Sequence, residues 1–191
     1  PFVFVLTSKL CAKRREAMQV ASERVGQLVM ETSSMPRHVI LCGYGRVGRN
    51  IARLLELFNV PYIVADLDPN TISVLREKGI PCVYGDAGNP HVLYKAGVED
   101  ADILALAIAD PVAVKLAIDH ARRINPNLDI IARAHSDLEH DFLKNRKVSE
   151  VVRPETEAGI EIARHILCRL GIAVAEVEKV ITSQRKIYPE A

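Results

Sequence analysis

Three glycines carry the clearest chemical signal in this sequence. Gly43, Gly45 and Gly48 form the pattern G-x-G-x-x-G, directly after the apolar run HVILC and before a segment with helical periodicity. In that setting the first glycine permits a tight turn, the second lets a phosphate approach the backbone, and the third permits close helix packing. The free N–H groups at the start of the helix then attract phosphate oxygens. The loop therefore predicts a phosphate-binding site.

An acidic residue at the end of the next apolar run agrees with the glycine loop. Asp66 ends the run YIVAD, about twenty residues after the loop, where a carboxylate accepts hydrogen bonds from an adenosine ribose. Because a carboxylate repels a 2′-phosphate, the pattern favours NAD or an adenine nucleotide over NADP. The alternative role for Asp66 is to cap a turn or a helix. We assign helix capping to Asp68 instead, since it directly precedes Pro69.

Two further side chains near this predicted site have more than one interpretation. Arg46 lies inside the glycine loop, where it either points toward the phosphates or is an exposed, solvated arginine. Gly85, Asp86 and Ala87 follow the third predicted strand and so come to the same edge of a parallel sheet. Asp86 there either meets the adenine or ribose, or caps the turn that follows.

Strand-like and helix-like segments alternate along most of the chain. The predicted strands are 38–42, 62–66, 82–84, 103–107, 130–133 and 150–152. The predicted helices are 46–58, 69–78, 90–96, 112–124, 137–145 and 155–169, with another helix after Gly171. Short strands that are apolar throughout, separated by helices, are typical of a parallel sheet covered on both faces. The sequence therefore predicts a doubly wound, Rossmann-like α/β domain with six strands.

Bulk properties and the missing catalytic patterns argue against several functions. The chain has 191 residues, too few for a separate substrate domain, and its net charge of +1 gives nucleic-acid binding no support. No Tyr-x-x-x-Lys pair occurs. His135 and His140 are the one pair that suggests a metal or acid–base role, but their spacing does not align them on one helical face, so we expect surface residues. The main hypothesis is therefore a nucleotide-binding domain that catalyses no reaction, and a small NAD-dependent oxidoreductase is the alternative.

The two ends of the chain suggest appendages to this domain. Residues 1–15, PFVFVLTSKLCAKRR, run from apolar to basic, as a membrane helix does at its cytoplasmic end, or they are the end of an amphipathic helix. An exposed helix is predicted over 9–31, and TSSMPR then breaks it. We therefore divide the chain into 1–36, 37–153 and 154–191. The apolar repeat after Gly171 either packs on its own domain or forms a partner interface.

Six segments together resemble a known family of regulatory domains. They are HVILCGYGRVG, VADLDP, YGDAGNP, ADILALAIADP, IIARAHS and VVRPETEAGIEIARHIL. In order and spacing they are similar to the RCK N-terminal, or TrkA-N, nucleotide-binding domains of potassium transport systems. The similarity is greatest to those at the C-terminus of Kef-type bacterial cation:proton antiporters. The chain departs from the family where it has Gly88, because the family often has threonine there.

The resemblance implies a regulatory role without catalysis. It implies a Rossmann-type fold with C-terminal dimerisation helices, a homodimer, and NAD(H), AMP, ADP or ATP bound without being consumed. It also implies an attached transmembrane transport domain at the cytoplasmic face of the inner membrane, with residues 1–36 as the end of its last helix and a linker. A soluble TrkA-like potassium-uptake subunit is the related alternative. Neither a metal site nor a nucleic-acid partner is implied.

The resemblance also assigns the ligand contacts. The glycine loop would hold the phosphates, Asp66 the ribose, Asp86 and Ala87 the adenine side, and Ala107 and Arg133 the far end of the ligand. The complete set of expected ligand-binding residues is Gly43, Tyr44, Gly45, Arg46, Val47, Gly48, Asp66, Leu67, Asp86, Ala87, Ala107 and Arg133.

Overall fold

A single parallel sheet forms the centre of the molecule in a computed structural model, which describes residues 37–187. Its strands are β1 (Val39–Cys42), β2 (Tyr62–Asp66), β3 (Cys82–Tyr84), β4 (Ile103–Leu106), β5 (Asp129–Arg133) and β6 (Glu150–Val152). Their order is β3-β2-β1-β4-β5-β6, and every neighbouring pair is parallel. The predicted six-stranded, Rossmann-like fold is therefore confirmed.

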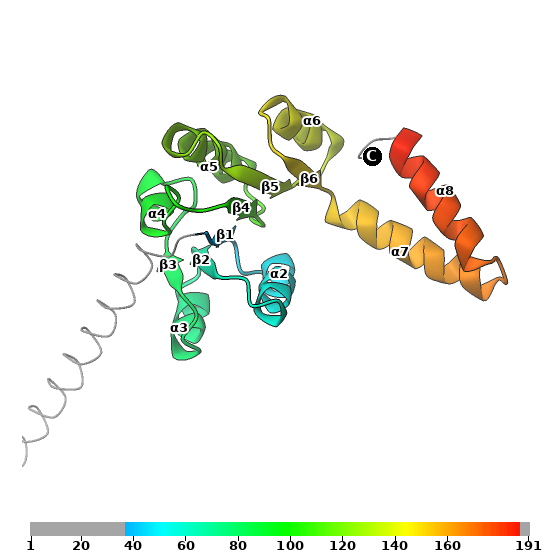
Figure 1. The fold of residues 1–191 in the computed structure, drawn as a ribbon, viewed down its shortest axis with the longest axis horizontal. Coiled ribbons are helices and arrows are strands. Elements are labelled where there is room, and N and C mark those ends of the chain that lie inside the picture. The colour runs from blue at the N-terminus through cyan, green and yellow to red at the C-terminus, as the bar shows by residue number, and fades with distance from the viewer. Residues whose placement is uncertain (1–36, 188–191) are drawn as a thin grey trace, which may run out of the picture.

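Helices cover both faces of this sheet. They are α2 (Arg46–Leu57), α3 (Pro69–Glu77), α4 (Pro90–Lys95), α5 (Pro111–Ile124), α6 (Asp137–Asn145), α7 (Pro154–Arg169) and α8 (Val174–Ile187). One buried cluster joins α2 and α3 to the sheet, and a second joins α4, α5 and α6 to its other face. Figure 1 shows the same division, with α2 and α3 on one side of the strands and α4 to α6 on the other.

The first strand shows why these strands are apolar at every position. All four residues of β1 are buried. Val39 and Leu41 pack in the cluster with α2 and α3, whereas Ile40 and Cys42 pack in the cluster on the opposite face. Successive side chains of a strand point to opposite faces, so a strand with a helix on each side must be apolar throughout. Burial of each such aliphatic side chain stabilises the fold by about 1.5–3 kcal/mol.

Helix ends follow the capping residues in the sequence, with shifts of about a residue from the predicted bounds. Asp68 caps α3 as predicted, because its carboxylate accepts hydrogen bonds from the N–H groups of Asn70 and Thr71. The helix predicted to begin at 112 begins at Pro111, because the Asp110 carboxylate accepts from the N–H groups of Val112 and Ala113. A proline at the first helical position has no N–H to satisfy, which suits that place.

The last two helices form a hairpin that extends away from the sheet (Figure 1). We call α7 and α8 together the C-terminal arm. Gly171, with φ +87°, lies in the turn between them, as the sequence predicted. The guanidinium Nε of Arg164 on α7 lies 2.7 Å from Glu178 Oε1 on α8, and Val177 is buried at 2% exposure. No residue of α7 itself is buried.

Two expectations concern the start of the chain. The predicted membrane-helix end and linker helix fall on residues 1–36, which lie outside the described residues. Within the part of the chain that the structure describes, no helix combines the length and apolar character needed to span a bilayer.

Gly48 provides a test of how closely α2 packs against the turn after β1. A Cβ at this position would lie 1.9 Å from the carbonyl oxygen of Gly43. Gly48→Ala must push the helix away from the turn, and we expect it to lower the free energy of unfolding by about 3 kcal/mol. Urea unfolding followed by circular dichroism measures the change.

Gly159→Ala in α7 is the matched control. A Cβ there meets no atom within 4 Å, and alanine is favoured over glycine inside a helix by about 0.5–1 kcal/mol. This variant should therefore lose no stability. A Gly48→Ala protein as stable as the unsubstituted chain would contradict the packing described above.

Candidate functional site

A cavity of about 350 Å³ lies at the carboxyl edge of the sheet. The strand order reverses between β1 and β4, and this switch point is where ligands bind in open α/β sheets. Residues at or just after the carboxyl ends of five of the six strands line the cavity. They are Gly43, Gly45, Ala65, Asp66, Leu67, Gly85, Asp86, Ala87, Ala107, Ile108, Ala109, Asp110, Ala113 and Arg133.

The requirement for glycine has a different structural cause at each of the three loop positions. Gly43 has φ +92°, and a Cβ there would lie 2.9 Å from Ile108 Cγ2. Gly48 lets the helix approach the carbonyl oxygen of Gly43. A Cβ on Gly45 would meet no atom within 4 Å, although Gly45 lines the cavity. Packing within the chain therefore does not require glycine at position 45, whereas close approach of a ligand to the backbone would.

The N-terminus of α2 is left without a side-chain cap at the cavity. Gly45 is its N-cap residue and supplies no side-chain hydrogen bond, and the first turn holds no acidic residue. By contrast, Asp68, Asn89, Asp110 and Ser136 cap α3, α4, α5 and α6 with their side chains. The first N–H groups of a helix need acceptors, and an anion is a suitable one. The start of α2 is therefore suited to a phosphate.

Asp66 and Asp86 both hold the surrounding loops and face the cavity. Asp66 Oδ2 accepts a hydrogen bond from the N–H of Tyr44 at 2.5 Å, and its Oδ1 accepts from the N–H of Asp68 at 2.8 Å. Asp86 Oδ1 accepts from the N–H of Gly88 at 2.8 Å. The turn-capping roles left open by the sequence are thus present, and they do not remove either residue from the cavity lining.

The structure brings most of the expected ligand-binding residues together, but not all. Tyr44, Arg46, Val47 and Gly48 are not among the lining residues, and Arg46 is exposed at the first position of α2. Six lining residues were not expected from the sequence. These are Ala65, Gly85, Ile108, Ala109, Asp110 and Ala113. Most of them directly follow a strand, so the rule that ligands bind outside the carboxyl ends of parallel strands could have identified them.

Acidic side chains dominate the charge of the cavity. Asp66, Asp86 and Asp110 contribute carboxylates, and Arg133 contributes the one guanidinium among the described lining residues. Burial of the Cys42 thiol, together with the smaller effect of the nearby charges of Asp86 and Asp66, raises the pKa of this thiol to about 12. The thiol therefore stays protonated at neutral pH, and it is a core residue rather than a nucleophile.

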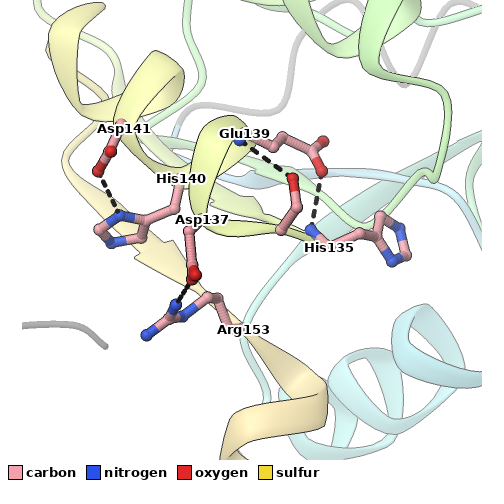
Figure 2. A network of polar contacts seen from close by, with 7 residues as sticks. His135, Asp137, Glu139, His140, Asp141 and Arg153 are labelled. Carbon is pink, nitrogen blue, oxygen red and sulfur yellow. Dashed lines mark hydrogen bonds and ion pairs between the residues drawn. The ribbon is translucent and has the colours of Figure 1, made fainter.

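The two histidines considered for acid–base chemistry lie apart and differ in exposure. His135 is exposed, and its backbone N–H donates to Glu139 Oε2 at 2.8 Å. His140 is 6% exposed, so the prediction of a surface residue is wrong for it. His140 and Leu143 lie together on the buried face of α6. The polar residues around position 140 in the sequence did not indicate this burial. Figure 2 shows the two rings on different sides of α6. The described residues contain no cluster of three metal-binding side chains.

Known proteins share this sequence and architecture. KefB of Alkalimonas amylolytica, named as a K(+) efflux antiporter, is 30% identical over 156 residues, which cover 82% of this chain and 24% of KefB. The chain thus spans about a quarter of this curated relative. The TrkA-N domain of the Escherichia coli inner membrane protein YbaL is 34% identical, with a TM-score of 0.64 over 72% of this chain and 98% of that one.

A second solved structure has a nucleotide bound. The C-terminal domain of Kef from Shewanella denitrificans, in its AMP-bound form, is 27% identical with a TM-score of 0.69 and covers 78% of this chain and 92% of that one. The model of the TrkA-N domain matches residues 39–154, which include every strand of the sheet and the cavity. This chain therefore belongs to the TrkA-N domain family.

Proposed function

We propose that this chain is the regulatory domain of a Kef-type potassium or cation:proton antiporter. In this proposal the domain lies at the cytoplasmic face of the inner membrane and is attached to a transmembrane transport domain. It binds NAD(H) or an adenine nucleotide in the cavity and passes the bound or empty state to the transporter. The observation that carries the proposal is the cavity itself. Its lining combines Asp66 with the start of α2, which no side chain caps, and with Gly45, where the chain has room for a Cβ.

The expected position of the ligand follows from the lining residues. The phosphate lies at the N–H groups that begin α2, and the Asp66 carboxylate accepts from the ribose hydroxyls, as in other sheets of this order. The adenine side lies toward Asp86 and Ala87, and Arg133 lies toward the far end of a longer ligand. AMP in the related Kef domain supports an adenine nucleotide as the ligand class.

The polar groups of the cavity favour binding over reaction. The lining side chains with ionisable groups are three aspartates and Arg133. Each of these aspartates already accepts a hydrogen bond from a backbone N–H. A dehydrogenase needs a proton donor or acceptor beside the nicotinamide, for which histidine, lysine or tyrosine is usual. We therefore propose that the nucleotide leaves this site unchanged.

Regulation requires that the ligand prefers one conformation of the transporter. A ligand shifts a conformational equilibrium only by its difference in affinity between the two states. The C-terminal arm offers the surface through which two copies would communicate. Ile162, Ile166 and Leu170 recur one turn apart on α7 and are 61%, 53% and 74% exposed. We propose that this stripe packs against a second copy of the chain in a homodimer.

Calorimetric titration with NADH, NAD, AMP and ATP tests nucleotide binding. We expect at least one to bind, and Asp66→Ala to weaken its binding by about 1–3 kcal/mol through the lost hydrogen bonds to the ribose. Asp66→Asn retains an acceptor for the N–H of Tyr44 and should weaken binding less. Asp68→Ala is the control, because Asp68 caps α3 and does not line the cavity. It should reduce stability but leave affinity unchanged.

The preference for NADH over NADPH gives a second readout of Asp66. The unsubstituted chain should bind NADH more tightly, because the carboxylate repels a 2′-phosphate, and Asp66→Ala should narrow the difference. The proposal fails if no adenine compound binds under any condition, or if NADH is steadily oxidised in the presence of aldehydes or ketones.

Gly45→Ala separates ligand approach from protein packing. The added methyl meets no atom of the chain but stands where the phosphate would lie. We expect affinity to fall by about 1–3 kcal/mol, roughly tenfold or more. Unfolding free energy should change by less than about 1 kcal/mol, since only the N-cap residue of α2 changes. Unaltered affinity in this variant would place the phosphate elsewhere.

Sedimentation velocity tests the proposed homodimer. The chain should sediment as a dimer, and Ile166→Glu should yield monomers because it buries a charge in the apolar stripe. Leu57→Glu is the control, since Leu57 is 70% exposed and belongs to α2 rather than to the arm. A monomeric parent chain, or a dimer broken equally by both substitutions, would refute the assignment to α7.

A further inference from the structure

The C-terminal arm is tied to the sheet by charged groups at the start of α7. Arg133, the last residue of β5, has its Nη2 atom 3.7 Å from Oε1 of Glu155 in the first turn of α7. Asp137, the first residue of α6, pairs with Arg153, the N-cap residue of α7 (Figure 2). Since α7 buries no residue, these ion pairs are placed to fix where the arm begins.

Two hydrogen bonds hold the loop between β5, which ends at Arg133, and α6, which begins at Asp137. The hydroxyl of Ser136 accepts from the N–H of Glu139 at 3.2 Å, and the Glu139 carboxylate accepts from the N–H of His135 at 2.8 Å. This reciprocal arrangement resembles a capping box and leaves little freedom between the end of β5 and the start of α6. Figure 2 shows both hydrogen bonds at the first turn of α6.

The guanidinium of Arg133 has partners at Nη2 but none at Nε among the described residues. Its Nη2 lies 3.2 Å from Nδ1 of His135 as well as near Glu155. Arginine only donates, so Nδ1 of His135 is the acceptor here. The Nε–H of Arg133 is buried and has no acceptor among residues 37–187. A buried donor without a partner is costly, and Arg133 lines the cavity. The positive charge of Arg133 is thus placed to attract an anionic ligand in the cavity.

The place of Arg133 in the sheet indicates which ligand atoms it meets. β4 lies between β1, which carries the glycine loop, and β5, which ends at Arg133. Two strand spacings amount to about 10 Å. A phosphate on the glycine loop therefore lies well short of the end of β5, and Arg133 is placed to meet oxygen atoms beyond the first phosphate.

We propose that Arg133 and Glu155 couple the far part of the nucleotide cavity to the C-terminal arm, an inference that rests on the proposed nucleotide binding. A phosphate or other oxygen beyond the first phosphate accepts a hydrogen bond from the guanidinium of Arg133, while Glu155 holds Nη2. Glu155 acts as a positioning residue and does not touch the ligand. Ligands that reach Arg133, such as ADP and NADH, order the start of α7, whereas AMP does not.

Linkage makes the coupling measurable from both ends. If the ligand strengthens the pairing between Arg133 and Glu155, then that pairing strengthens ligand binding by the same factor. Glu155→Gln should raise the Kd for ADP and NADH about 3–5-fold, the size for a partly exposed ion pair. The Kd for AMP should change less than about twofold, within the small effect of a surface substitution.

A double-mutant cycle separates coupling from a merely structural role of Glu155. An acidic residue in the first turn also stabilises α7 through the helix dipole, and that effect does not depend on Arg133. We expect Arg133→Gln combined with Glu155→Gln to bind ADP no more weakly than Arg133→Gln alone. Glu176→Gln, an exposed acid in the first turn of α8, is the control and should alter no affinity.

Hydrogen exchange reads the arm directly. ADP and NADH should slow amide exchange in the first two turns of α7 in the unsubstituted chain, and Glu155→Gln should abolish this protection. The inference is overturned if Glu155→Gln weakens AMP and ADP equally, if the two substitutions add, or if α7 gains no protection. If nucleotides bind but one of these contradicting results is found, only the coupling through Arg133 and Glu155 is refuted. If no nucleotide binds at all, the proposed function is refuted as well.

Discussion

The close approach of α2 to the turn after β1 is the constraint on which the rest of the structure depends. A Cβ on Gly48 would lie 1.9 Å from the carbonyl oxygen of Gly43, and Gly43 itself has φ +92°. Only glycines allow the helix to begin so close to the end of a buried strand. The N–H groups of the first turn of α2 are consequently fixed at the edge of the cavity, at the switch point of the sheet.

Side-chain charges alone would not attract an anion to this cavity. Its carboxylates outnumber its one guanidinium in the described lining, and they accept hydrogen bonds from neighbouring N–H groups. Those hydrogen bonds hold Asp66 against the glycine loop, so the acid and the loop keep a fixed relative position. Attraction for an anionic ligand must then come mainly from the start of α2, where oriented peptide dipoles act at short range.

The body of the domain and its C-terminal arm are stabilised differently. Both faces of the sheet are covered by apolar clusters, whereas α7 buries no residue and exposes a stripe of large aliphatic side chains. An element with few buried contacts has low local stability and responds readily to small changes in free energy. Polar ties at its first turn, through Arg153 and Glu155, therefore have more influence on α7 than similar pairs would have on a buried helix.

The sequence by itself determined the parallel strands, the glycine turn and the caps such as Asp68, because these follow from steric and hydrogen-bonding rules that act within a few residues. It also indicated Asp66, whose place at a strand end is fixed by local spacing. Only the tertiary structure decided that Asp110 shares a cavity with the glycine loop, that Arg133 meets Glu155, and that His140 is buried. These relations depend on strand order and on which helix face turns inward, and both are set by packing between segments far apart in the chain.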